Sequence, residues 1–214
     1  TLTHFCAAVS SKMLEENPQI NSLIRFGRVY PRKSIDIFVH VSDKNKIDDL
    51  SGVVLRSTNH QSISNIEQFL NKEAKLVRSK EDSHYKKVKN IFNLIPGFFA
   101  APFLWFYGFI LYDLNIWSIF LRTPKDPFGS MMLTNIGSLG LDMAFVPIAP
   151  YTRIPLILSL GKVYDSPLIV NGELKNSKMV KACWTFDHRL IDGSHAAHMS
   201  ESFKKYFANP ELIK

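Results

Sequence analysis

The stretch WTFDHRLIDGSHAAHMSESFKKYFANPELI, Trp184–Ile213, determines the fold more than any other part of the chain. An aromatic, strand-like run gives way to a helical pattern, so we expect a strand, a tight turn and a last helix capped by Ser194. The turn contains His188, Asp192 and Gly193 with the spacing HxxxDG, and Gly193 permits a tight exit. A neutral imidazole held there is a natural base for a thiol or hydroxyl proton. The alternative is a buried histidine beside a helix cap.

Immediately upstream, the sequence reads as β structure. PLILSLGKV, Pro155–Val163, indicates a buried strand, Val170–Glu173 a hairpin turn, and Met179–Phe186 the returning strand. Before these, Gly129–Ile148 is strand-like and then turns on glycines. We therefore expect strands on both sides of the hairpin turn, with the second leading into the His188 turn.

The N-terminal half alternates between helical and strand periods. Thr1–Glu16 has apolar residues at helical spacing, and Asn17-Pro18 ends it. Strict alternation inside Arg28–Ser42 predicts a half-buried strand, and Val53–Leu55 predicts another. A second helix runs from Ser62 or Ser64 to about Lys80. This order favours a mixed α/β sandwich, with a mostly antiparallel sheet flanked by helices.

One apolar stretch fits none of these elements. Asn90–Tyr112 contains no charged residue, and the apolar character continues beyond Asp113 to Phe120. We expect Pro96-Gly97 and Pro102 to break its first half, which leaves too little unbroken helix to span a membrane. Packing in the core or between subunits is favoured over a membrane-surface or acyl-chain-binding element.

Composition limits the class of protein. With 214 residues, 46% hydrophobic and 21% charged, the chain suits a single globular domain over residues 1–214. The net charge of +7 suits an anionic partner, but the basic residues are too dispersed to indicate nucleic acid. Cys6 and Cys183 match no zinc or CxxC spacing, so we expect a reducing, cytoplasmic location. Because no leader precedes Thr1, we expect a fragment or a trimmed chain.

The other candidate sites are weaker. His195 and His198 lie near His188, but the three do not share one helical face and no acid or cysteine completes a set, so we expect no metal. Ser138 lacks a GxSxG elbow, which argues against a serine hydrolase.

Several segments resemble one known family in its own order. Trp184–Ile213 resembles the C-terminal signature of the dihydrolipoamide acyltransferase catalytic domains of 2-oxoacid dehydrogenase complexes, which share the chloramphenicol acetyltransferase fold. GSMMLTNIGSLGLD, Gly129–Asp142, resembles the family's segment around its oxyanion-stabilising hydroxyl, and Pro155–Val163 its penultimate buried strand. Val53–Lys75 and ENPQIN, Glu16–Asn21, also fit. Together these segments cover nearly the whole chain.

The resemblance implies a mechanism. His188 would deprotonate a thiol or hydroxyl acceptor, which attacks the thioester of acyl-CoA, and a lipoyl group is one such acceptor. Alignment through the shared Asn-x-Gly puts Thr134 at the position of the oxyanion-binding hydroxyl, usually a serine. Asp192 would orient the loop and the imidazole. The family's active site lies between subunits of a homotrimer. No set of lysines or arginines stands out as the site for CoA phosphates.

The chain also departs from the family. It lacks the family's opening helix and strand, and it contains no lipoyl domain, no subunit-binding domain and no linker rich in Ala and Pro. The apolar insertion at about 90–120 replaces a short polar connection. It suits a divergent, stand-alone member that acts on a lipid acceptor or sits peripherally at a membrane.

Two further functions compete with this one. The wider HxxxDG superfamily includes condensation domains and wax-ester or glycerolipid acyltransferases, but these often carry a second histidine where Asp187 stands, and their motif lies farther from the C-terminus. A non-catalytic trimeric scaffold is the other alternative. The retained His188, Asp192 and Thr134 argue against it.

Overall fold

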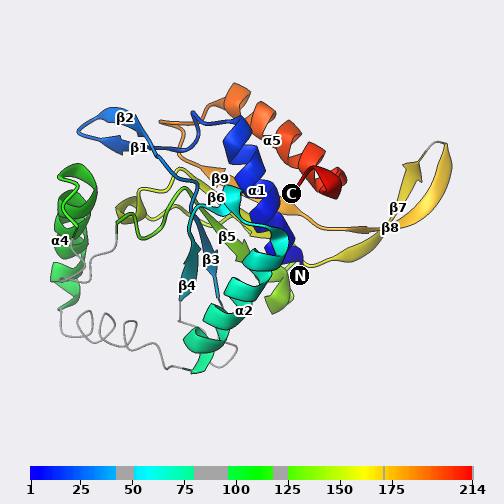
Figure 1. The fold of residues 1–214 in the computed structure, drawn as a ribbon, viewed down its shortest axis with the longest axis horizontal. Coiled ribbons are helices and arrows are strands. Elements are labelled where there is room, and N and C mark those ends of the chain that lie inside the picture. The colour runs from blue at the N-terminus through cyan, green and yellow to red at the C-terminus, as the bar shows by residue number, and fades with distance from the viewer. Residues whose placement is uncertain (42–50, 80–95, 118–124, 171, 214) are drawn as a thin grey trace.

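The computed structural model describes residues 1–41, 51–79, 96–117, 125–170 and 172–213. Its centre is a five-stranded sheet with the order β4-β3-β5-β6-β9 (Figure 1). The strands are β3 (Ile37–His40), β4 (Gly52–Leu55), β5 (Met131–Asn135), β6 (Leu156–Leu160) and β9 (Ala182–Phe186). The two inner pairings, β3–β5 and β5–β6, are parallel, and the outer ones, β3–β4 and β6–β9, are antiparallel. The expected mixed α/β fold is confirmed, with the antiparallel pairs at the edges of this sheet.

Three helices cover one face of the sheet (Figure 1). They are α1 (Leu2–Glu16), α2 (Ile63–Ser79) and α5 (Gly193–Ala208), close to the bounds that helical periodicity predicted. Alternate strand residues such as Met131, Leu133 and Leu158 join the apolar faces of these helices in one core cluster. Because side chains alternate along a strand, Thr134 and Ser159 point to the opposite face.

Two hairpins extend from the sheet, and the hairpin turn expected at Val170–Glu173 belongs to one of them, whereas the other was not expected. β1 (Ser22–Arg25) and β2 (Arg28–Pro31) pair around Phe26-Gly27, whose positive φ angles suit a two-residue hairpin turn. β7 (Tyr164–Val170) and β8 (Glu173–Met179) form a second hairpin that projects from the body (Figure 1). The returning strand expected at Met179–Phe186 is β9, which begins only at Ala182, because Met179 is the last residue of β8. β6 pairs with β9 across an inserted hairpin, whose turn residue 171 lies outside the described residues.

The described part of the apolar insertion, residues 96–117, is helical. α4 (Gly97–Gly108) continues into a π-helical turn, Phe109–Asp113. α4 begins directly after Pro96, but Pro102 lies inside the helix, so the expected break there is wrong. Leu111 and Tyr112, in the π-helical turn, are buried. None of the helices described here is both long and apolar enough to cross a membrane.

Candidate active site

His188 lies in a turn that is fixed at both ends. β9 ends at Phe186, and the Asp187 amide donates to the carbonyl of Pro155 at 2.8 Å. The Asp187 carbonyl then accepts from the amide of Ile191 at 3.0 Å, and the Ile191 side chain is fully buried in the core. His188 itself is exposed, with its ring 6.2 Å from that of Phe186. No hydrogen bond to a described residue occupies the imidazole, so the alternative of a buried histidine is wrong.

The carboxylate of Asp187 stiffens the same turn. It accepts hydrogen bonds from the Arg189 amide at 3.1 Å and from the Arg189 guanidinium at 2.6 Å. The hydrogen bond from Arg189 lowers the pKa of Asp187, so this carboxylate stays ionised at neutral pH. Arg189 is therefore paired with a carboxylate, although its own side chain is exposed.

Asp192, and not Ser194, caps α5. The Asp192 carboxylate accepts from the His195 amide at 2.9 Å, from the Ser194 hydroxyl at 2.8 Å, and also contacts the His195 ring. These hydrogen bonds hold the pKa of Asp192 well below its usual range, and the one from the His195 amide has the largest effect. An ionised side chain at a helix N-terminus also interacts favourably with the helix dipole. Asp192 therefore fixes the exit of the turn, but it makes no hydrogen bond to His188 within this chain.

Gly193 needs none of the conformational freedom expected of it. Its φ is not in the left-handed region, and a Cβ built there meets no atom within 4 Å. The glycine that does matter lies after β5. A Cβ on Gly137 would be 2.4 Å from the carbonyl oxygen of Gly161, because the turn Ile136–Leu139 stacks on the end of β6. The sequence signal for this close approach was the pair of glycines in GSMMLTNIGSLGLD and PLILSLGKV.

Thr134 lies near the end of β5, on the face away from the three helices. Only 9% of it is exposed, and its hydroxyl has no hydrogen-bond partner among the residues that the structure describes. The next residue, Asn135, binds the Ser138 amide at 3.2 Å and the Thr3 hydroxyl at 3.0 Å, which fixes the end of the strand. Thr134 is therefore a free hydroxyl on a rigid element, which suits a preorganised donor.

The structure does not bring Thr134 and His188 together within one chain. Thr134 is level with Ser159 of β6, and Ser159 is level with Cys183 of β9. His188 follows Cys183 by five residues, about 16 Å along an extended strand, and two strand spacings add about 10 Å across the sheet. A hydrogen bond between the two sites needs a second copy or a large movement.

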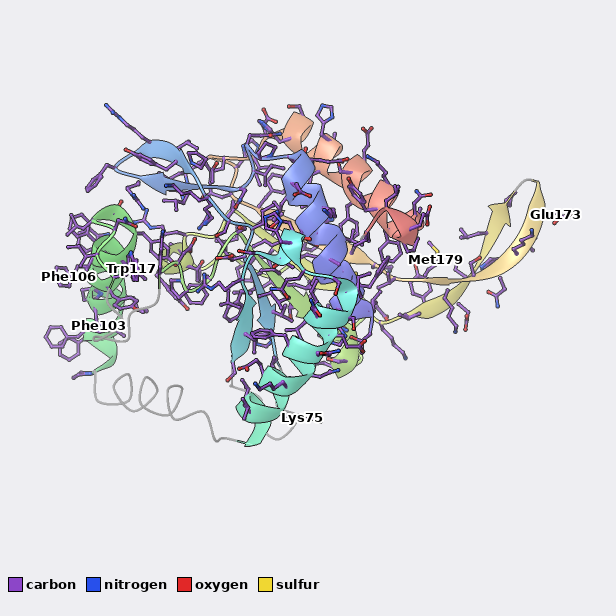
Figure 2. The ribbon with its side chains drawn as sticks, viewed as in Figure 1. Lys75, Phe103, Phe106, Trp117, Glu173 and Met179 are labelled. Carbon is purple, nitrogen blue, oxygen red and sulfur yellow. The ribbon has the colours of Figure 1, made fainter. Side chains whose placement is uncertain are left out.

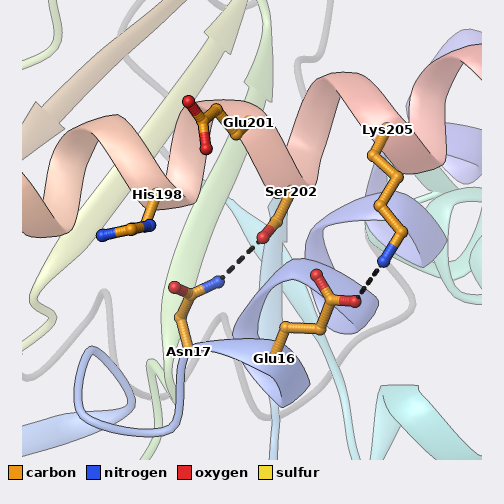
Figure 3. Close-up of a pocket in the computed structure, with 6 residues that line it drawn as sticks. All are labelled: Glu16, Asn17, His198, Glu201, Ser202 and Lys205. Atoms are coloured by element: carbon orange, nitrogen blue, oxygen red, sulfur yellow. Dashed lines mark hydrogen bonds and ion pairs between the residues drawn. The ribbon is translucent and has the colours of Figure 1, made fainter.

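The hollow shown in Figure 3 is separate from these residues. It has a volume of about 530 Å³ and lies between the end of α1 and α5. Its polar groups are largely satisfied by each other: Lys205 donates to Glu16 at 2.6 Å, and Asn17 donates to Ser202 at 3.3 Å. Neither His188 nor Thr134 lines it. Within the described ranges, no cluster of three or more His, Cys, Asp or Glu is placed to hold a metal ion.

Comparison with known proteins finds matches for the part of the chain that carries these residues. The model of the 2-oxoacid dehydrogenases acyltransferase (catalytic domain) family matches residues 125–214. The dihydrolipoyllysine-residue acetyltransferase component of the pyruvate dehydrogenase complex of Mycoplasma capricolum is 35% identical over 83 residues, and that of Staphylococcus aureus is 31% identical over 81 residues. Each match covers 38% of this chain and 18% of the relative's length.

Solved structures match the whole chain. A probable dihydrolipoamide acetyltransferase from Listeria monocytogenes has a TM-score of 0.68 at 20% identity, and the cubic core of the pyruvate dehydrogenase multienzyme complex has 0.70 at 18%. The dihydrolipoamide acetyltransferase of Azotobacter vinelandii has 0.69 at 19%. Each comparison covers 100% of this chain and 70% of the solved chain. The chain therefore has the fold of these proteins, and its residues 125–214 match the model of the 2-oxoacid dehydrogenases acyltransferase (catalytic domain) family.

Proposed function

We propose that this chain transfers an acyl group from an acyl-CoA thioester to a thiol or hydroxyl acceptor, with His188 as general base. The observation that carries this is the exposed His188 imidazole, free of hydrogen bonds to the described residues and held in a turn fixed by Asp187 and Ile191. A base so placed can reach an external acceptor without first breaking an internal bond. The match of residues 125–214 to the acyltransferase family model supports the reaction class.

The proton and the acyl group move in a balanced cycle. The free imidazole nitrogen of His188 takes the proton of the acceptor, whose sulfur or oxygen attacks the thioester carbonyl carbon. The carbon–sulfur bond to CoA then breaks, and the imidazolium returns the proton to the departing CoA thiolate. The Thr134 hydroxyl donates to the oxyanion of the tetrahedral intermediate, where one such donor is worth about 10²–10³ in rate. A lipoyl dithiol is the acceptor that the names of the relatives favour.

A study of the Azotobacter vinelandii protein supports these roles. Its catalytic mechanism was investigated at a histidine, an asparagine four positions later and a serine fifty-two positions earlier. In this chain Asp192 follows His188 by four positions, and Thr134 precedes it by fifty-four. An aspartate in place of the asparagine fits the observed role of Asp192, because a carboxylate caps α5 and positions the turn.

We place the complete site between subunits of a homotrimer. Thr134 and His188 are too far apart to act in one chain, so the hydroxyl has to come from a neighbouring copy. The surface is suited to assembly: Ile169 and Leu174 on the β7–β8 hairpin are 76% and 74% exposed. Apolar side chains at such positions are typical of protein–protein contacts.

The first experiment measures CoA release from a series of acyl-CoAs, from acetyl to palmitoyl, with dihydrolipoamide and simple alcohols as acceptors. His188→Gln is expected to lower turnover by about 10²–10⁴. His198→Gln is the matched control, because His198 is also exposed and lies on the adjoining helix. Equal turnover in wild type and His188→Gln would refute the general-base role and favour the non-catalytic scaffold.

The second experiment tests the shared site. Thr134→Val and His188→Gln chains are unfolded together, refolded as a mixture and assayed. In a randomly mixed trimer, about a quarter of the interfaces combine an intact His188 with an intact Thr134, so about a quarter of wild-type activity should return. No recovery, with trimers present, would place both groups in one subunit.

The cellular setting stays a proposal as well. Cys6 and Cys183 are both free and buried, which is consistent with a reducing, cytoplasmic compartment. The relatives' names mention no membrane, so the membrane contact expected of residues 90–120 needs separate support from the surface of α4.

A further inference from the structure

α4 presents an apolar face that no described element covers. Phe98, Phe99, Trp105 and Phe106 are spaced so that they share one side of the helix, and Phe98 and Trp105 are 75% and 67% exposed. In Figure 2, Phe106 lies on the outer side of α4, turned away from the sheet. Together with Phe26, these four side chains are called the aromatic surface. Soluble proteins rarely leave so many adjacent aromatic rings in water.

The helix is held in this orientation from behind. At its C-terminal end, buried Asp113 forms an ion pair with Arg153 at 2.7 Å and accepts from the Phe26 amide at 3.2 Å. Arg32 pairs with Asp126 at 2.6 Å beside it and also donates to the Arg153 carbonyl. Fixed, partly buried ion pairs of this kind set the direction of an element. The end of the π-helical turn after α4 is therefore tied to Arg153 and to the tip of the β1–β2 hairpin.

The aromatic surface continues onto the β1–β2 hairpin. The ring of Phe26, at the tip of the hairpin, meets Phe109 edge-on at 6.1 Å, and Phe109 stacks on Trp105 at 5.8 Å. Phe26 is 61% exposed, so the hairpin tip and α4 offer one surface. Two separate elements, joined by ring contacts, thus present apolar side chains to the same side.

The charges on the hairpin beside this surface are positive. Arg25 and Arg28 flank the tip that carries Phe26, and Arg28 is exposed. From Gly97 to Trp117 the only charged residue is Asp113, which is already neutralised by Arg153. Aromatic rings, tryptophan above all, with arginine at the rim match the boundary between lipid headgroups and acyl chains.

We propose that the aromatic surface docks on an anionic lipid membrane, with α4 lying in the plane of the interface. At 12 residues α4 is about 18 Å long, too short to span a bilayer. A second copy packed face to face is disfavoured as the occupant, because two such surfaces would bring Arg25 and Arg28 against their like-charged equivalents. This docking goes beyond acyl transfer and does not depend on it.

The test is sedimentation of the full chain with vesicles of phosphatidylcholine, with and without phosphatidylglycerol. Binding should be stronger to the anionic vesicles and fall with added salt. Trp105→Glu combined with Phe106→Glu should lower binding at least tenfold, because charges would enter the apolar boundary. Phe69→Glu, at a partly exposed aromatic on α2, is the matched control and should leave binding unchanged. Arg28→Ala should lower binding to anionic vesicles about fivefold.

A second readout guards against a folding artefact. Circular dichroism and melting of each variant are compared with wild type, and tryptophan quenching by brominated lipids is measured on the wild-type protein. Trp105 should be quenched, whereas Trp184, packed against Phe203 at 5.1 Å, should not. The proposal is overturned by equal binding to both vesicle types, by equal losses in Phe69→Glu and the double variant, or by a change in oligomeric mass of the double variant without lipid.

Discussion

Gly137→Ala is expected to destabilise this fold, because Gly137 has backbone against it on the side where a Cβ would go. The added Cβ would lie 2.4 Å from the Gly161 carbonyl oxygen, 2.6 Å from its carbon and 2.7 Å from the Lys162 nitrogen. All three are main-chain atoms at the end of β6, so no flexible side chain can make room. The turn must retreat by about 1 Å to reach ordinary van der Waals contact.

Overpacking of this size costs about 2 kcal/mol, which lowers the melting temperature of a domain of this length by about 4–8 °C. Urea denaturation followed by circular dichroism measures the free energy of unfolding. Gly193→Ala is the control: a Cβ there meets no atom within 4 Å, and alanine is the better helix former, so stability should stay equal or rise by under about 1 kcal/mol. The steric reasoning is refuted if the two variants are equally stable, or if Gly137→Ala matches wild type within about 0.5 kcal/mol.

Two other predictions concern charged groups. Arg153→Met should lower the free energy of unfolding by about 3 kcal/mol, because it leaves the Asp113 carboxylate buried without its cation. Arg189→Met, which breaks the exposed pair with Asp187, should cost under about 1 kcal/mol, and similar losses in urea melts of both variants would contradict this. The lowered pKa values of Asp187 and Asp192 predict a pH dependence. Their stabilisation is present above the unfolded pKa of about 3.9 and is lost as the pH falls through the lower folded pKa. Melting temperatures between pH 7 and pH 3 should therefore fall less steeply in Asp192→Asn, and an unchanged slope would exclude this role.

Most of the secondary structure near the site could be predicted from local sequence. Helical spacing placed α1 and α2 and strand-like runs placed β6, because each pattern records which side chains one element must bury. The HxxxDG spacing also placed His188 in a turn between a strand and a helix, which the structure confirms. The cap was harder to assign: Asp192 and Ser194 are both good N-cap residues, and only the backbone geometry decides between them.

The sequence by itself therefore determined most of the elements, the His188 turn and the match of residues 125–214 to an acyltransferase family model. The tertiary structure decided what those elements meet. It inserted the β7–β8 hairpin between paired strands β6 and β9, kept Pro102 inside a helix, and separated Thr134 from His188. The physical reason is that periodicity reports burial along one element, whereas strand order and the distance between two sites depend on contacts between residues far apart in the chain.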